Sequence, residues 1–246
     1  MITHILTDIN YKNLFENWSH FLTPYEHSVD HIKIEYSAEC PILTDLEGRK
    51  FQIDFVNDKI NYHKKKLGIN SEPLSRSLGS GKQGKKILDL SAGLGIDAIF
   101  LTQLGYQVKA LERNPFIFKA LDNALNCLNQ FQNLNSISNS ALEFIFTEAL
   151  VFLKETKDEF DVCYFDPMFP AKKKSALPKQ EMVFFKKLVG TDADSQEIIE
   201  YAILSKKFKR IVVKRPSTSD PYISKSIKPA GAILGKMIRY DIYSNT

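Results

Sequence analysis

The sequence has few cysteines and no long apolar run, and each shortage excludes a class of protein. Its three cysteines, Cys40, Cys127 and Cys163, are odd in number and far apart. This argues against a disulfide framework and for a reducing compartment. No apolar run approaches the length that spans a membrane. Residues 1–13 contain no basic segment followed by an apolar one, so we expect no signal peptide and a cytoplasmic protein.

The net charge is also small, and histidines are few. The formal net charge is +4, from 33 basic and 29 acidic residues, which permits an anionic partner without requiring one. All five histidines lie within residues 1–63, and the closest pair, His27 and His31, has no cysteine or acidic partner in a zinc pattern. We therefore expect no metal. The lack of histidine after residue 63 also excludes a Ser-His-Asp arrangement in the remainder of the chain.

The pattern of the chain changes near residue 80. Before it, apolar and polar residues alternate at 32–36 and 51–55, which predicts half-buried strands, and Gly48 marks a turn between them. We expect residues 1–80 to form a small antiparallel β appendage of two or three strands, followed by a short helix at 71–78 and a basic linker. Residues 81–246 then form the main domain.

In residues 81–246, short apolar strands alternate with helices, which predicts a mostly parallel α/β sheet with helices on both faces. Helices are expected at 96–104 (ending at Gly105), at 115–130, from residue 149, and at 195–205 with Ser195 as the N-cap. The C-terminal segments 232–234 and 237–243 are expected to form an antiparallel pair. The predicted parallel strands are residues 87–90, 108–111, 144–146, 162–165 and 211–213.

A glycine-rich turn follows the first of these strands. The segment reads Asp89-Leu90-Ser91-Ala92-Gly93-Leu94-Gly95-Ile96-Asp97-Ala98 and satisfies the G-x-G-x-x-A nucleotide fingerprint. Glycines let the backbone turn sharply and approach a ligand closely. Glu112 ends the next strand, where a carboxylate can accept both hydroxyls of a ribose. Nicotinamide-dependent oxidoreductases and S-adenosylmethionine-dependent methyltransferases share these features.

The charge of the ligand separates these two classes. The pyrophosphate of a dinucleotide favours a helix N-terminus without negative charge, whereas S-adenosylmethionine carries a sulfonium and an ammonium group. Asp89 and Asp97 flank the glycine turn and suit the cationic ligand better. We therefore favour S-adenosylmethionine as the cofactor. A nicotinamide-dependent oxidoreductase is the alternative, and Asp97 can also be interpreted as an ordinary first-turn helix residue.

A second candidate segment, Asp166-Pro167-Met168-Phe169-Pro170, follows the predicted strand at 162–165. Prolines stop the strand and leave a carboxylate at its carboxyl end, where ligands bind in open α/β sheets. Asp166 and the carbonyl of Pro167 can accept hydrogen bonds from an exocyclic amine, and Phe169 can stack on a base. The segment resembles the D/N-P-P-F/Y loop of amine-directed methyltransferases, with Met168 replacing the second proline. The plainer interpretation is a strand and a tight turn with Phe169 in the core.

Several further motifs resemble the bacterial 16S ribosomal RNA guanine-N2-methyltransferase family of the J type. They are A-G-L-G-x-D-A at 92–98, L-E-R-N-P at 111–115, the block from D-P-M-F-P to L-V-G at 166–190, V-V-K-R-P at 212–216, and Tyr240-Asp241-Ile242-Tyr243. The resemblance runs from about residue 51 to the C-terminus. It implies a class I methyltransferase domain, S-adenosylmethionine as the cofactor, and methylation of a guanine N2 near the 3′ end of 16S ribosomal RNA in the small ribosomal subunit.

The same resemblance implies a set of cofactor contacts. Ile96 stands where the family usually has arginine, and Glu148 stands where a small polar residue is common. Together with Asp89, Gly93 and Gly95 of the glycine turn, the implied contacts are Ile96, Asp97, Glu112, Arg113, Glu148, Ala149 and Asp166.

Basic residues form groups that can contact RNA phosphates. One group directly follows the Asp166 segment. A guanine inside a stem would have to be extruded to reach Asp166. A solvated charged face is the simpler interpretation of such runs. For the chain as a whole, a non-catalytic RNA-binding or ribosome assembly module is a further alternative. The candidate RNA contacts are Lys64, Lys65, Lys66, Lys172, Lys173, Lys174, Lys214 and Arg215.

Overall fold

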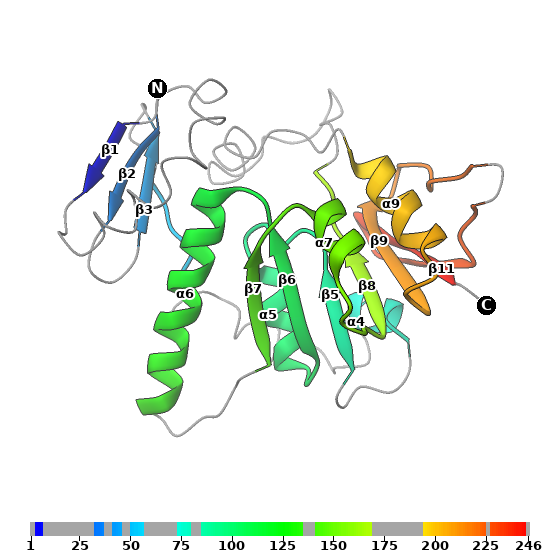
Figure 1. The fold of residues 1–246 in the computed structure, drawn as a ribbon, viewed down its shortest axis with the longest axis horizontal. Coiled ribbons are helices and arrows are strands. Elements are labelled where there is room, and N and C mark those ends of the chain that lie inside the picture. The colour runs from blue at the N-terminus through cyan, green and yellow to red at the C-terminus, as the bar shows by residue number, and fades with distance from the viewer. Residues whose placement is uncertain are drawn as a thin grey trace. The chain divides into compact units, whose positions relative to one another are not determined.

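The computed structural model describes residues 3–6, 32–36, 41–45, 50–56, 73–79, 85–134, 141–168, 194–224 and 227–244 (Figure 1). The chain divides into two compact units. One comprises residues 1–58, 114–138 and 170–191, and the other comprises 59–113, 139–169 and 192–246. Among the helices that the structure describes, none has the length and apolar character needed to cross a membrane. The predicted division near residue 80 stays a prediction.

The first unit contains a four-stranded sheet in the order β1 (Thr3–Leu6), β2 (Ile32–Tyr36), β3 (Pro41–Asp45) and β4 (Lys50–Phe51). The predicted strand at 32–36 is confirmed. The expected wholly antiparallel arrangement is wrong, because β1 pairs with β2 in parallel. The strand predicted at 51–55 is also wrong beyond Phe51. There the Asp54 side chain accepts the N–H of Val56 at 2.9 Å, a local hydrogen bond that turns the chain away from the sheet.

The first unit also holds the long helix α6 (Pro115–Leu134), which is longer than the predicted 115–130. Asn114 precedes it, and its side-chain oxygen accepts the N–H of Ile117 at 3.2 Å, which satisfies one of the free donors of the first turn. Proline at the first helical position costs no hydrogen bond there. Ile117, Leu121 and Ala124 are buried at helical spacing.

The second unit is built on a seven-stranded sheet with the order β10-β11-β9-β8-β5-β6-β7. The pairs among β5 to β9 are parallel, and β11 pairs antiparallel with both β9 and β10. This confirms the mostly parallel sheet with an antiparallel C-terminal pair. The strands are β5 (Lys86–Asp89), β6 (Gln107–Glu112), β7 (Leu142–Phe146), β8 (Val162–Phe165), β9 (Arg210–Pro216), β10 (Gly231–Leu234) and β11 (Ile238–Ser244).

Helices cover both faces of this sheet (Figure 1). On one face, α4 (Pro73–Ser77) packs against β10 and β11, and α5 (Ile96–Gln103) packs against β6 and β7. On the other face, α7 (Ala149–Glu155) packs against α9 (Ser195–Leu204), and α9 packs against β9. Each helix lies where the sequence predicts one.

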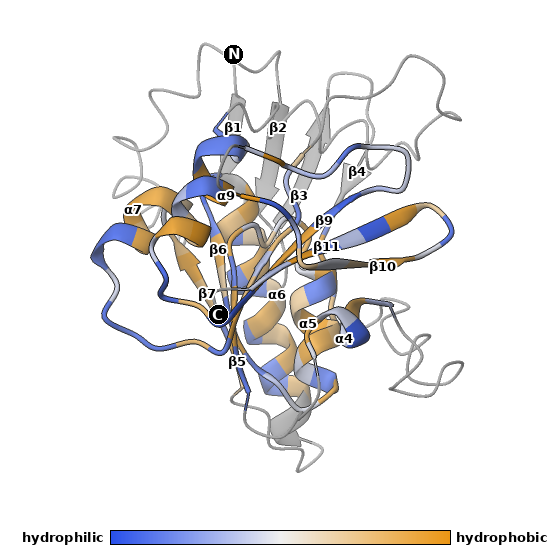
Figure 2. Cartoon of the chain, turned by 90° about the vertical axis from the view of Figure 1, so that its right-hand side faces the viewer, coloured by the Kyte–Doolittle hydropathy of each residue, from blue (hydrophilic) through white to orange (hydrophobic). Residues whose placement is uncertain are grey.

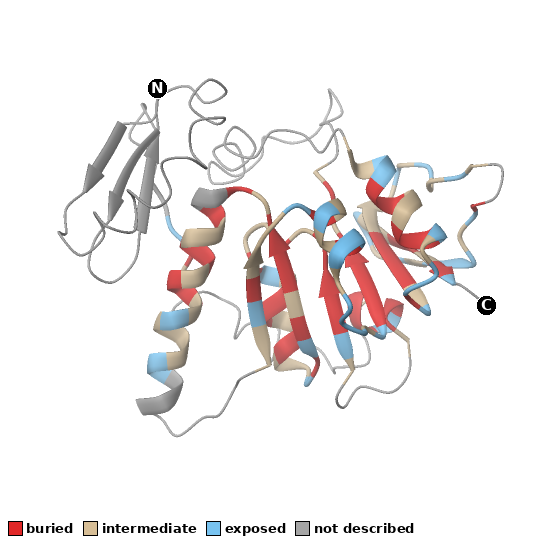
Figure 3. Cartoon of the chain, in the orientation of Figure 1, coloured by how far each residue is buried: buried red, intermediate tan, exposed pale blue. Residues whose placement is uncertain are grey.

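The main core lies between the sheet and the helices α7 and α9. Leu88, Cys163 and Ile211 are register neighbours on β5, β8 and β9, and all are buried with Leu153 and Ala202 of the two helices. Figure 3 shows these central strands buried along most of their length. Because side chains alternate along a strand, the residues between these positions face the α4 and α5 side.

The start of α9 differs from the prediction. The sequence predicts Ser195 as the N-cap, but Asp194 occupies that position and makes no side-chain capping bond. Its carboxylate instead accepts Arg113 Nη1 at 3.1 Å. A charge-assisted bond to an arginine on a neighbouring segment is stronger than a neutral cap, so it draws the side chain away from the helix.

The strand order places a topological switch point between β5 and β8. From β5 the chain continues to β6 on one side, and β8 lies on the other side of β5. Leu90 N–H donates to the Tyr164 carbonyl at 2.9 Å, and Ala92 N–H donates to the Leu111 carbonyl at 2.7 Å. The segment after β5 is thereby fixed to both neighbouring strands. Ligands of open α/β sheets bind at such a point.

Candidate active site

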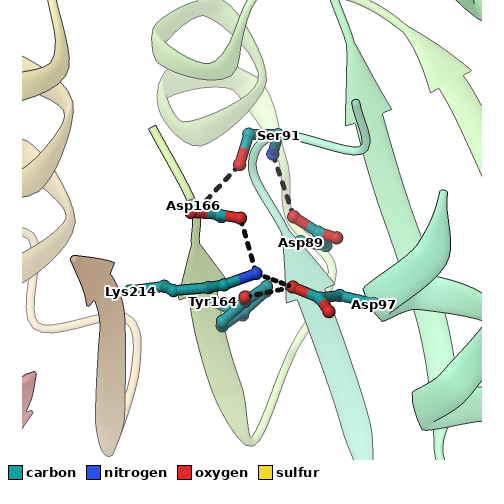
Figure 4. Close-up of polar contacts among 6 residues, drawn as sticks. All are labelled: Asp89, Ser91, Asp97, Tyr164, Asp166 and Lys214. Carbon is teal, nitrogen blue, oxygen red and sulfur yellow. Dashed lines mark hydrogen bonds and ion pairs between the residues drawn. The ribbon is translucent and has the colours of Figure 1, made fainter. Parts of the chain in front are cut away.

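Four polar side chains meet at the switch point (Figure 4). Lys214 Nζ lies 2.8 Å from Asp97 Oδ2 and 2.8 Å from Asp166 Oδ2. The Tyr164 hydroxyl donates to the same Asp97 oxygen at 2.5 Å. The ammonium of Lys214 therefore joins the first turn of α5 to the segment that follows β8.

Strand register explains why these residues meet. Phe165 pairs with Val213 across β8 and β9, so the next residues, Asp166 just past the end of β8 and Lys214 within β9, lie side by side. Tyr164 lies two residues before Asp166 and therefore shares its face of the sheet. That face is the one covered by α5, whose first turn carries Asp97.

The electrostatics of Lys214 are set by its two carboxylate partners. Burial alone lowers the pKa of this amine, but the nearby charges of Asp97 and Asp166 outweigh burial and raise the pKa above its ordinary value. Lys214 is therefore protonated throughout the physiological range. A partly buried ammonium between two carboxylates holds both of them in one geometry, and removing it would leave two like charges facing each other.

Asp89, the last residue of β5, is 1% exposed. Burial raises the pKa of its carboxyl to about 8, the hydrogen bond from Ser91 N–H opposes this, and the charges of Asp97 and Asp166 add to the rise. Burial also raises the pKa of Tyr164 well above its ordinary value. The Tyr164 hydroxyl therefore remains a donor to Asp97.

Ser91 connects the glycine turn to the Asp166 segment. Its N–H donates to Asp89 Oδ1 at 3.0 Å, and its hydroxyl oxygen accepts the N–H of Asp166 at 2.9 Å. Ser91 therefore fixes the backbone of Asp166, and Lys214 fixes its carboxylate. The buried Pro167 follows directly and restricts the backbone further.

The glycine turn takes a conformation that requires glycine. Gly93 and Gly95 have φ values of 55° and 73°, in the left-handed region that other residues rarely adopt. Gly93 N–H donates to Glu112 Oε2 at 3.0 Å, and Glu112 is 6% exposed at the end of β6. The turn and the predicted ribose-binding carboxylate are thus parts of one hydrogen-bonded unit.

The remaining implied cofactor contacts surround this unit. Ile96 is half exposed at the start of α5. Arg113 Nη1 contacts both Asp194 oxygens at 3.1 Å and lies 3.8 Å from Glu148 Oε2. Glu148 occupies the N-cap position of α7, and Ala149 is the buried first residue of that helix.

Other predicted site residues lie elsewhere. Phe169, the lysines at 64–66 and the lysines at 172–174 fall outside the described residues. Arg215 lies on β9 next to Lys214, with intermediate exposure. The ammonium of Lys214 lies between two carboxylates, and its predicted contact with RNA stays a prediction.

The sequence interpretation missed three residues of this arrangement. Tyr164 could have been found from strand alternation, because it lies two residues before Asp166 on a strand end. Ser91 lies two residues beyond Asp89, within reach of a local side-chain bond to the turn. Asp194 carries no local signal, because its partner Arg113 is distant in sequence.

The site fits a cationic nucleoside cofactor. The charges of Asp97 and Asp166 act on the buried carboxyl of Asp89, and such a gathering of carboxyl groups suits a ligand with a positive charge. Glu112 and the positive-φ glycines suit a sugar that lies close to the backbone. Among the described residues, no group of His, Cys, Asp and Glu side chains could hold a metal ion.

Comparison with known proteins gives matches over most of the chain. Residues 31–245 match the model of a family of SAM-dependent methyltransferases. The ribosomal RNA small subunit methyltransferase J of Bdellovibrio bacteriovorus is 42% identical over 204 residues, covering 81% of this chain and 76% of that protein. The protein of the same name from Thioalkalivibrio sulfidiphilus is 36% identical over 228 residues, covering 84% of this chain and 86% of that protein.

A solved structure shows the same fold. The SAM-dependent methyltransferase of Neisseria gonorrhoeae superposes with a TM-score of 0.66 at 20% identity, covering 98% of this chain and 96% of that chain. This likeness bears on the fold alone and agrees with the seven-stranded sheet.

Proposed function

Because the chain belongs to the ribosomal RNA small subunit methyltransferase J family, we propose that it methylates the exocyclic N2 amine of a guanine near the 3′ end of 16S ribosomal RNA. The chain is a SAM-dependent methyltransferase, as the sequence predicts. Neither the oxidoreductase nor the non-catalytic module gains support from these relatives. We expect the protein to act in the cytoplasm, because its proposed substrate is ribosomal RNA.

One observation supports an amine as the methyl acceptor. Asp166 is held by Lys214 Nζ at 2.8 Å and, through its N–H, by Ser91 Oγ at 2.9 Å. A carboxylate fixed in this way at the carboxyl end of β8 is a preorganised hydrogen-bond acceptor. The exocyclic amine of guanine presents two N–H donors, so it needs acceptors of this kind.

The residues of this chain orient the N2 amine, and the reaction needs no general acid. The lone pair of the N2 amine is delocalised into the guanine ring, so the amine is a weak nucleophile that must be oriented for attack. Asp166 accepts one amine N–H and the Pro167 carbonyl accepts the other, which directs the nitrogen at the reacting carbon. The bound cofactor would supply the methyl group and keep the electron pair of its carbon–sulfur bond. The Asp166 carboxylate would accept the proton that the methylated nitrogen releases.

The residues around the glycine turn would hold S-adenosylmethionine, which supplies an electrophilic methyl group when bound. Glu112 would accept the ribose hydroxyls, and Gly93 and Gly95 would allow the backbone to approach the cofactor. Asp89 and Asp97 would face its positive charges. Ile96, Arg113, Glu148 and Ala149 would line the remainder of the site.

The decisive experiment is methyl transfer to small ribosomal subunits from a strain that lacks this activity. We expect incorporation of a tritiated methyl group with S-adenosylmethionine, at a single guanine near the 3′ end of the RNA. Reverse-transcription mapping with and without the protein identifies the nucleotide. Incorporation into another base, or no incorporation at saturating cofactor, would contradict the proposal. Titration with S-adenosylhomocysteine and with NADH tests the cofactor separately.

A further inference from the structure

The turn between β10 and β11 lies at the same edge of the sheet as Asp166. Arg239 pairs with Arg215, and Ile238 pairs with Pro216, so β11 begins where β9 ends. Ser217 N–H donates to the Met237 carbonyl at 3.0 Å, which ties the turn to the segment after β9. Since β9 and β8 are parallel neighbours, the turn and the candidate active site share the carboxyl edge.

The tip of this hairpin exposes large apolar side chains. Leu234 is 68% exposed and Met237 is 75% exposed, the highest values for large hydrophobic side chains in the described part of the chain. Figure 2 shows the hairpin at the margin of the sheet, with hydrophobic and hydrophilic residues adjacent along it. Two such side chains on one turn, beside a catalytic edge, indicate a surface that a partner covers.

The charge around the hairpin is positive. Lys236 lies between the two apolar residues and is exposed. Among the described residues from 214 to 244, basic side chains outnumber acidic ones by five to two. The basic residues are Lys214, Arg215, Lys228, Lys236 and Arg239, and the acidic ones are Asp220 and Asp241. A second copy of this chain is a poor occupant, because like charges would face each other across the contact.

A buried carboxylate fixes the base of the hairpin. Asp241 is fully buried, and its Oδ1 accepts Arg239 Nε at 2.8 Å and contacts Nη2 at 2.6 Å. Its Oδ2 has no hydrogen-bond partner among the described residues. Arg239 and Asp241 lie on the same face of β11, two residues apart. This pair holds the Arg239 guanidinium beside Arg215 at the edge of the sheet.

We infer that the β10–β11 hairpin is a docking element for ribosomal RNA. In this arrangement Leu234 and Met237 contact exposed bases, while Lys236 and Arg239 contact the neighbouring phosphates. An RNA surface presents bases and phosphates side by side, which matches the alternation of apolar and basic residues. A guanine that leaves a stem to reach Asp166 requires a second contact that holds the opened RNA nearby. The inference rests on the proposed function, since it assumes an RNA substrate.

Photo-cross-linking tests the contact directly. A photo-reactive amino acid is placed at position 237 of the full-length protein, which is irradiated with purified small subunits. We expect a cross-link to RNA near the methylated guanine, and a much weaker one from position 204. Leu204 is also exposed (55%), but it ends α9 at the opposite edge of the sheet. A cross-link only to ribosomal protein, only to a second copy, or no stronger than at position 204 would overturn the inference.

A matched pair of double variants provides the kinetic test. Leu234→Ser with Lys236→Ala should raise the KM for small subunits about tenfold, with kcat and S-adenosylhomocysteine affinity unchanged. The slope of the logarithm of the binding constant against the logarithm of the salt concentration should also decrease in magnitude by about one. The control is Leu204→Ser with Lys209→Ala, where Lys209 is exposed just before β9. Equal KM values for the two variants would overturn the inference. Methyl transfer by the wild type on the same particles tests the proposed function independently.

Discussion

Lys214 Nζ lies 2.8 Å from Asp166 Oδ2, so a cation on β9 orients the carboxylate that ends β8. The same ammonium lies 2.8 Å from Asp97 Oδ2 on α5. The residue proposed to hold the methyl acceptor and a residue proposed to face the cofactor therefore share one positively charged partner. This arrangement makes Lys214 a positioning residue for both halves of the site.

Replacing Lys214 should impair positioning and change the pH dependence of the reaction. In Lys214→Met, Asp97 and Asp166 lose the ammonium that holds them together. The buried carboxyl of Asp89 loses a nearby positive charge that lowers its pKa, so Asp89 ionises at higher pH. We expect kcat at pH 7 to fall by about 100-fold and to recover partly as the pH rises. The measurement is a pH profile of kcat under saturating substrates.

Lys214→Arg is the control for this prediction. It keeps the positive charge between the two carboxylates and should retain more activity than Lys214→Met, with a pH profile close to that of the wild type. If both variants lose activity equally and neither profile shifts, the role of Lys214 is structural rather than electrostatic.

Removing the carboxylate of Asp166 should abolish most of the methyl transfer. Asp166→Ala deletes an oriented acceptor at the edge of the sheet, and we expect single-turnover rates to fall by about 100-fold or more. The fold should persist, since the side chain is partly exposed and contributes little to the core. Thermal unfolding by circular dichroism checks the fold.

Asp158→Ala is a suitable control for Asp166→Ala. Asp158 also pairs with a lysine, Lys109, at 2.7 Å, but on the segment that leads to the opposite, amino end of β8. This variant should retain full activity. Unimpaired transfer by Asp166→Ala would remove that residue from the mechanism.

The sequence predicted the sheet well because its signals are local. Apolar runs marked each parallel strand, and Gly105, with a φ of 91°, ended α5 as expected. The glycine turn and the Asp166 segment were identified from residue types alone. The short-range signals failed beyond Phe51, where a local side-chain hydrogen bond turns the chain, and at Ser195, where a distant arginine holds the neighbouring Asp194.

The ionic network could not be predicted in the same way. Asp97 and Lys214 are far apart in the sequence and meet only because β5, β8 and β9 pair in one register. A lysine in a V-V-K-R segment is typical of a surface charge until its neighbours on adjacent strands are known. The pairing of Arg239 with the buried Asp241 likewise depends on the burial of β11, which composition does not reveal.

A side chain at Gly93 should strain the backbone of the glycine turn. Its φ of 55° lies in the left-handed region, so Gly93→Ala should lower the free energy of unfolding by about 1–2 kcal/mol. We also expect weaker binding of S-adenosylhomocysteine, because the turn is proposed to lie against the cofactor. Chemical denaturation and calorimetric titration measure the two effects.

Gly105→Ala separates strain from binding. Gly105 also has a positive φ, 91°, and a Cβ there would meet nothing within 4 Å. It ends α5 away from the glycine turn, so this variant should lose similar stability yet bind S-adenosylhomocysteine normally. If Gly93→Ala also binds normally, the turn does not contact the cofactor.

Asp89 should make the protein less stable as the pH rises. Its pKa in the folded state is about 8, against an ordinary value of 3.8, so the folded carboxyl keeps its proton while the unfolded one is ionised. Unfolding therefore releases a proton between about pH 4 and pH 8. Higher pH favours the unfolded state there, by up to about 1.4 kcal/mol per pH unit.

Comparison with Asp89→Asn isolates this contribution. The variant cannot ionise, so its melting temperature should rise relative to the wild type from pH 4 to pH 8, and the difference should stop growing above about pH 8. The control is Asp158→Asn. The hydrogen bond from Lys109 lowers the pKa of Asp158, so the ionisation of this residue changes the stability only at pH values below 4. A constant difference between wild type and Asp89→Asn across this range would contradict the buried, protonated carboxyl.

Binding of S-adenosylmethionine should release protons near pH 7. The proposed site brings a positive charge close to Asp89, which favours the ionised carboxylate and lowers the pKa from about 8. A carboxyl that is mostly protonated before binding then loses part of its proton to the buffer. Calorimetric titrations in phosphate and in Tris, which differ in ionisation enthalpy, give the number of protons released. Asp89→Asn should bind the cofactor without this release. If the wild type and Asp89→Asn release the same number of protons on binding, the charge of the cofactor does not act on Asp89.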